Sequence, residues 1–146
     1  MLPLLLAGAF RELTGSLHTE LARHGHGQAR PIHGFALQAI GADGITVSEL
    51  GRRLGVSKQA AAKTAARLEE LGYVTRRPST DDARATVLTR TALGEEMLDL
   101  SAAIFEQLRW DWDRRVGASR IQAVEDALAE ITTGGARIGD LPGWLH

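Results

Sequence analysis

The sequence of 146 residues predicts a mainly α-helical fold with one small β-hairpin. Three observations support this: apolar residues recur at helical spacing over most of the chain, two short helices are joined by a tight connection, and one β-prone stretch is interrupted by turn-forming residues. Because 44% of the residues are apolar, the chain can form its own core. We therefore expect a single domain spanning residues 1–146.

The first forty residues have the pattern of two helices. Leucine and phenylalanine recur every three or four positions from Leu6 to Leu21, which makes one apolar helix face. Glycines at 25 and 27 then lower the helix propensity. Pro31 suits the first position of a second helix, which we expect to close at Gly41 or Gly44.

The next segment predicts a helix-turn-helix. Thr46 and Glu49 have the spacing of a capping box at the start of a short third helix, which Gly55 ends. Ser57 caps a fourth helix that runs to Gly72. Two helices joined by a connection as short as Leu-Gly-Val-Ser form this motif.

A hairpin and two further helices complete the predicted elements. The β-prone stretches YVTRRP and RATVLT flank the turn-rich STDDA, a pattern typical of a hairpin. Thr91 caps a long fifth helix that Gly117 breaks, and a last helix spans about 118–131 with a matching apolar seam. The tail, 132–146, has no usable periodicity.

Composition excludes several classes of protein. The absence of cysteine excludes disulfides, zinc ribbons and a thiol switch. No apolar run is long enough to span a membrane, and the apolar start lacks the basic segment of a signal peptide, so we expect a cytoplasmic protein. There is no nucleophile–base set, phosphate loop or recognised metal spacing among the histidines, so we expect no enzyme activity, no cofactor and no metal.

The formal net charge of −1 conceals a basic segment. Residues 52–90 include nine Lys or Arg and four acidic residues, a local charge of +5. The rest of the chain has eight Lys or Arg and fourteen acidic residues, a charge of −6. A polyanion responds to the local field rather than to the total charge. A solvated charged surface would have the same composition.

The fourth helix has one face suited to a DNA major groove. At 100° per residue, small alanines lie beside Gln59 and Lys63 on the side opposite the apolar face. Gln can pair with adenine and Lys with guanine acceptors, while Ser57 and the free backbone N–H groups can hold a phosphate. An alanine-rich amphipathic helix with ordinary solvated polar residues fits the same pattern. The candidate DNA-binding residues here are Ser57, Lys58, Gln59, Lys63 and Arg67.

The hairpin adds further candidates. Arg76 and Arg77 lead into it as expected phosphate contacts, and Arg84 lies just past its tip, with Asp82 placed to orient the guanidinium. An arginine at such a tip can reach a narrow minor groove. The alternative is a charged hairpin that shields an exposed strand edge.

The segment SELGRRLGVSKQAAAKTAARLEELGYVTRRPSTDDARATVLTRTALG resembles the winged helix-turn-helix of MarR-type regulators. The most specific parts are LEELGYVTRR, the wing signature DDAR, and the Thr91–Gly94 spacing at the start of the fifth helix. The two helices on either side extend the resemblance over nearly the whole chain. Arg90 departs from the family, which usually has an apolar residue there, and so does the alanine content of the fourth helix.

The resemblance implies a transcriptional regulator, most simply a repressor, that binds double-stranded DNA as a homodimer. It divides the chain into N-terminal dimerisation and core helices (1–45), the winged helix-turn-helix (46–90) and dimerisation helices (91–131). A dimer would read a pseudo-palindrome with half-sites about 10 base pairs apart. The alternative to the dimer is that the terminal helices pack only within one chain. The alternative to DNA binding is a winged helix that contacts protein.

The resemblance also implies a small aromatic or phenolic ligand that releases the DNA. The candidate lining residues are His18, His33, Trp110 and Trp112. Trp112 falls on the apolar stripe of its helix, where a core role explains it equally well, whereas Trp110 falls on the opposite side.

Overall fold

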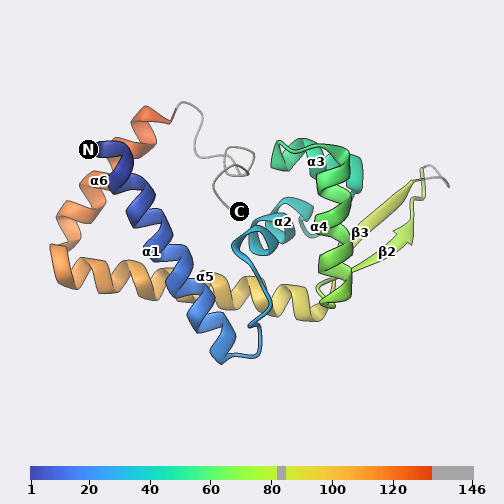
Figure 1. Cartoon of the computed structure of the whole chain (residues 1–146), viewed down its shortest axis with the longest axis horizontal. Coiled ribbons are helices and arrows are strands. Elements are labelled where there is room, and N and C mark those ends of the chain that lie inside the picture. The colour runs from blue at the N-terminus through green and yellow to red at the C-terminus, as the bar shows by residue number, and fades with distance from the viewer. Residues whose placement is uncertain (82–84, 133–146) are drawn as a thin grey trace. The chain divides into compact units, whose positions relative to one another are not determined.

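The computed structural model describes residues 1–81 and 85–132, which form six helices and three strands (Figure 1). The mainly α-helical fold with a small β-wing is confirmed. No helix in this described part is both long and apolar enough to cross a membrane. The elements are α1 (Leu2–Arg23), α2 (Pro31–Ile40), β1 (Ile45–Thr46), α3 (Val47–Leu54), α4 (Lys58–Glu70), β2 (Val74–Pro78), β3 (Thr86–Arg90), α5 (Ala92–Val116) and α6 (Ala118–Ile131).

The described residues fall into two compact units. Residues 28–81 and 85–99 form the winged unit, and residues 1–27 with 100–132 form the terminal-helix unit. The helix α5 contributes its first eight residues to the winged unit and the rest to the other. The helix-turn-helix and the hairpin therefore share one unit.

The predicted helix caps of the helix-turn-helix are present. The Thr46 hydroxyl accepts a hydrogen bond from the Glu49 N–H (3.2 Å), and Gly55 ends α3 in the left-handed conformation (φ 66°). The Ser57 hydroxyl accepts from the Ala60 N–H (3.1 Å) at the start of α4. The Glu49 carboxylate does not complete a capping box, because it binds Arg52 and Arg53 instead.

The core of the winged unit comes from every one of its elements. Its largest fully buried side chains include Leu37 and Ile40 of α2, Leu54 of α3, Leu68 of α4 and Leu88 of β3. Each contributes about 1.5–3 kcal/mol by burial. This packing fixes α4 against the unit by one face and leaves the other face outside.

The sheet has the order β1–β3–β2, with both pairs antiparallel. The hairpin β2–β3 was expected, but the two-residue strand β1 was not predicted, because it leads directly into α3 and is too short to show alternation. In Figure 1 the two long strands project to one side of α4. The hairpin therefore stands beside the helix-turn-helix as a wing.

The junction between the wing and α5 requires a glycine. The Thr91 hydroxyl donates to the Gly72 carbonyl (2.6 Å) and accepts from the Gly94 N–H (3.1 Å). A side chain at Gly94 would overlap the Tyr73 carbonyl oxygen. The Thr91–Gly94 spacing seen in the sequence thus reflects a close approach of α5 to the residue that precedes β2.

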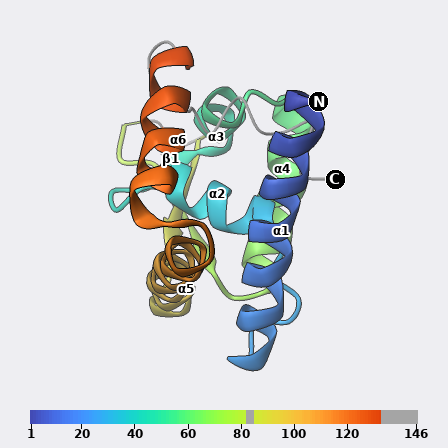
Figure 2. The same cartoon turned by 90° about the vertical axis from the view of Figure 1, so that its left-hand side faces the viewer.

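The terminal-helix unit contains α1, most of α5 and α6. Gly117 (φ 105°) separates α5 from α6, as predicted. Figure 2 looks along α5 and shows α6 rising across its axis. Within this unit Arg115 of α5 pairs with Glu12 of α1 (3.2 Å).

Candidate nucleic-acid interface

The face of α4 predicted to point outward is the exposed one. Ala61, Ala65 and Leu68 are fully buried against the unit. On the other side Gln59, Ala62, Lys63, Ala66 and Glu70 are all exposed, and Lys58 is exposed on the flank. Towards its N-terminus the exposed face thus carries one amide and two ammonium groups among methyl groups, and Glu70 lies at its far end.

Ion pairs divide the cations of the basic segment into two sets. Arg52 and Arg53 pair with Glu49, Arg67 with Glu70, Arg76 with Glu69, and Arg90 with Glu95. In the described residues Lys58, Lys63 and Arg77 have no acidic partner; Arg77 donates only to the Asp43 carbonyl (3.3 Å). Glu49 and Glu95, which pair with Arg52, Arg53 and Arg90, lie outside the counted segment, so counting charges between 52 and 90 overstates its positive charge.

Arg67, a predicted phosphate contact, binds residues of its own unit. Its guanidinium donates to Glu70 (2.6 Å) and to the Gln28 side-chain carbonyl (2.8 Å). Gln28 is the first residue of the winged unit. In this arrangement Arg67 joins α4 to the segment that precedes α2.

Two arginines that sequence reasoning left without a role hold the end of α2. Arg90 Nε donates to the Leu37 carbonyl (2.8 Å), and Arg53 Nη1 donates to the Ala39 carbonyl (2.8 Å). The Leu37 carbonyl also accepts from the Gly41 N–H (3.3 Å), and the guanidinium groups add donors from neighbouring elements at this helix end. Arg90, at a position where an apolar residue is usual in MarR-type regulators, thus supplies a hydrogen-bond donor that an apolar side chain would lack.

His33, a candidate ligand contact, is a buried part of α2. Its Nδ1 accepts from the Arg30 N–H (2.9 Å) at the helix start, and only 5% of the residue is exposed. Burial, together with the charges of Arg67 and Arg30, lowers its pKa from 6.5 to about 4. His33 is therefore neutral at pH 7, and its observed role is structural.

The wing carries two of the predicted basic residues. Arg76 and Arg77 are consecutive on β2, so their side chains leave opposite faces of the hairpin, and both are exposed. Arg76 Nε donates to Glu69 of α4 (3.0 Å). The predicted wing-tip pair, Asp82 and Arg84, lies outside the described residues.

The other candidate ligand residues lie in the terminal-helix unit. His18 and Trp112 are half-buried, whereas Trp110 is 54% exposed with the Arg114 guanidinium over its ring (4.8 Å). His24 is exposed and His26 is buried. Among residues 1–81 and 85–132 no group of three His, Asp or Glu side chains could hold a metal ion.

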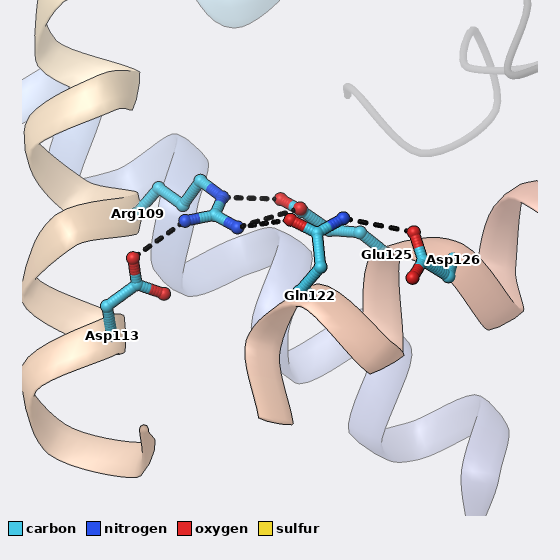
Figure 3. Close-up of polar contacts among 5 residues, drawn as sticks. All are labelled: Arg109, Asp113, Gln122, Glu125 and Asp126. Carbon is cyan, nitrogen blue, oxygen red and sulfur yellow. Dashed lines mark hydrogen bonds and ion pairs between the residues drawn. The ribbon is translucent and has the colours of Figure 1, made fainter. Parts of the chain in front are cut away.

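A polar cluster joins α5 to α6 in the same unit (Figure 3). Arg109 donates to both carboxylate oxygens of Glu125 (2.8 and 2.9 Å) and to Asp113 (2.7 Å). The bond to Glu125 raises the pKa of Arg109, and the same bond lowers the pKa of Glu125. Both groups therefore remain charged at neutral pH, and the pair connects two helices that Gly117 separates.

Comparison with known proteins agrees with the fold and with the wing. Residues 30–85 match the model of the MarR family. No curated relative matches the chain by sequence. Reduced MarR from E. coli is 21% identical with a TM-score of 0.76, over 90% of this chain and 96% of that one.

Two further structures are similar over the same extent. The transcriptional regulator Tm0710 from Thermotoga maritima is 26% identical (TM-score 0.63, 90% and 92% covered). A variant of MepR from S. aureus, solved bound to an oligodeoxyribonucleotide, is 14% identical (TM-score 0.64, 91% and 96% covered). The family consists of transcriptional regulators and not of enzymes. Residues 30–85 therefore match the MarR family, and the chain has the fold of the MarR-type transcriptional regulators to which it is similar.

Proposed function

We propose that this chain is a sequence-specific regulator of transcription that inserts α4 into the major groove of double-stranded DNA. The observation that carries the proposal is the exposed face of α4, where Gln59, Lys58 and Lys63 stand among alanines. Small residues let a helix enter the groove deeply, and polar residues near its N-terminus meet base edges. The family match and the similarity to a MepR variant bound to an oligodeoxyribonucleotide support it.

Within this proposal the residues of the interface have separate roles. Gln59 pairs with an adenine and Lys63 with guanine acceptors, while Ser57 holds a phosphate at the start of α4. Arg77 contacts the backbone from the wing, and Arg84, oriented by Asp82, reaches the minor groove. Arg67 contacts phosphate only if it leaves Glu70 and Gln28.

We also propose that the protein acts as a homodimer. In the terminal-helix unit Leu2, Leu4 and Leu5 of α1 are more than 60% exposed, and so is Ile131 of α6. Apolar side chains gathered near helix ends favour association with a second copy, and a two-fold operator requires a two-fold protein. The proposed operator is a pseudo-palindrome with half-sites about 10 base pairs apart.

The remaining parts of the proposal concern organisation and control. The two units act as one MarR-like domain, with 1–45 and 91–131 supporting 46–90, and the protein represses cytoplasmic promoters by occupying them. A small aromatic or phenolic ligand would release it by changing the separation of the two copies of α4. The candidate contacts for that ligand are His18, Trp110 and Trp112. His33 is no longer among them, because it is buried and bonds the start of α2.

Selection of genomic DNA fragments on the purified protein tests the DNA-binding proposal. We expect an enriched pseudo-palindrome, and we expect Gln59→Ala to lose discrimination at one position per half-site, worth about 1–3 kcal/mol. Gln38→Ala, an exposed change on α2, is the matched control. If no fragment is enriched and no complex forms at low salt, the wing serves protein contacts instead.

The dimer has its own test. Leu5→Glu places a charge on the exposed apolar part of α1, and we expect it to convert the protein to a monomer in sedimentation equilibrium. Leu93→Glu changes an exposed leucine of the winged unit and should leave the dimer intact. A wild-type protein that sediments as a monomer contradicts the dimer but not the binding of DNA.

A further inference from the structure

A cleft opens between the helix-turn-helix and the wing. Its volume is about 450 Å³, and it is lined by Thr46 and Ser48 where α3 begins, Lys58 and Ala62 of α4, Arg76 of β2 and Thr86 of β3. Two cations from different elements and three hydroxyl groups thus line the same cleft. All of these residues belong to the winged unit.

The two cations of the cleft have donors to spare. The Lys58 ammonium group makes no hydrogen bond or ion pair with any other described residue, and it carries three donors. Arg76 uses Nε to bind Glu69 (3.0 Å), and neither of its Nη groups bonds to another described residue. The guanidinium is therefore held by one edge while its other donors remain available to an anion.

The place of the cleft connects it with the exposed face of α4. Ala62 both lines the cleft and lies on that face. A duplex that receives α4 in its major groove would carry one strand of its backbone past Ala62. A planar guanidinium and an ammonium are the groups that proteins use to bind phosphate oxygens.

We propose that this cleft binds one phosphodiester of the DNA backbone through Lys58 and Arg76, and that Glu69 is the positioning residue of Arg76. The inference rests on the proposed function and deepens it. It assigns Lys58 to a backbone contact, and it gives Glu69, an acidic residue beside Arg76, a role in binding. Lys63 and Gln59 remain to read the bases.

The test is the salt dependence of binding to a short fluorescent duplex, followed by anisotropy. One neutralised phosphate adds about 0.9 to the slope of log affinity against log salt concentration. Lys58→Gln and Arg76→Gln should therefore each lower the slope, and the double variant should lower it by about one in total. Arg23→Gln removes an exposed cation of the terminal-helix unit and should leave the slope unchanged. Thermal melts verify that each variant is folded.

Glu69 needs a separate comparison, because removing an acid also favours a polyanion in general. Glu70→Gln makes the same change in charge one residue away, at the partner of Arg67. We expect Glu69→Gln to bind several-fold more weakly than Glu70→Gln, and this difference to vanish when both are made in the Arg76→Gln background. A purely electrostatic effect of the carboxylate would persist in that background.

The outcomes separate the inference from the function on which it rests. If the wild-type protein binds the duplex and both cleft variants match Arg23→Gln in slope and affinity, the phosphate site is refuted while DNA binding stands. If Glu69→Gln and Glu70→Gln behave alike, the positioning role is refuted. A wild-type protein that binds no duplex at about 50 mM salt refutes the proposed function itself.

Discussion

At the scale of single residues, His33 makes stability depend on pH. Its pKa falls from 6.5 to about 4 on folding, chiefly because it is buried. Between these values the unfolded chain binds a proton that the folded chain does not, so stability decreases as the pH falls through this window. We expect His33 to account for up to about 3 kcal/mol of that loss, all of it regained above pH 6.5.

Urea denaturation between pH 4 and 8 measures this effect against the general acid response of the carboxylates. His33→Gln should flatten the curve between pH 6.5 and 4. His24→Gln removes an exposed histidine and should keep the shape of the wild-type curve. Parallel curves for wild type and His33→Gln would contradict the burial of a neutral imidazole beside Arg30 and Arg67.

Gly94 gives a second prediction at this scale. A methyl group there would overlap the Tyr73 carbonyl oxygen, so Gly94→Ala should lower the free energy of unfolding by about 2–4 kcal/mol. Gly8→Ala is the control, because nothing lies within 4 Å of a side chain at that position of α1. It should be neutral or stabilising by about 0.5–1 kcal/mol. Equal stabilities of the two variants in thermal unfolding would refute the close approach.

The sequence predicted the polar residues of the interface better than their partners. Alternation of faces at 100° per residue correctly separated Ala61 and Leu68 from Gln59 and Lys63, because burial of α4 follows from local periodicity. The bonds from Arg90 to Leu37 and from Arg67 to Gln28 span 53 and 39 residues. No local pattern carries that information, so charge counting treated both arginines as free.

At the scale of elements, the base of the wing binds the C-terminal end of α2 through Arg90. Arg90→Met keeps most of the apolar stem but removes the charged donor, so the Leu37 carbonyl keeps only its bond from the Gly41 N–H (3.3 Å). We expect a loss of about 1–3 kcal/mol, since the group is part-buried. Arg52→Met, which breaks only an exposed pair with Glu49, should cost less than about 1 kcal/mol.

Hydrogen exchange can assign the loss from Arg90→Met to this element. Protection should fall first in the last turn of α2 and in β3, and it should be retained in α4. A uniform loss of protection across the winged unit would mean that Arg90 supports the whole core. Helix boundaries were the well-predicted part at this scale, since glycines and caps mark them, whereas β1 depends on pairing with β3 and has no signal of its own.

At the scale of the whole molecule, the cluster around Arg109 joins α6 to α5 across the break at Gly117. Of the apolar residues proposed to meet a second copy, Ile131 lies on α6, so its position depends on this connection. Arg109→Gln removes the bonds to Glu125 and Asp113 together. Because a two-fold interface uses the same surface of both copies, a small change in the position of α6 alters the contact on both sides.

We therefore expect Arg109→Gln to raise the dimer dissociation constant by about tenfold or more, measured by sedimentation velocity over a dilution series. Arg120→Gln removes an exposed cation of α6 and should leave the constant unchanged. High salt screens exposed ion pairs, so it should weaken the wild-type dimer and bring it towards the variant. If Arg109→Gln dimerises like wild type at every salt concentration, the interface does not depend on the α5–α6 connection, and α1 alone must hold the two copies together.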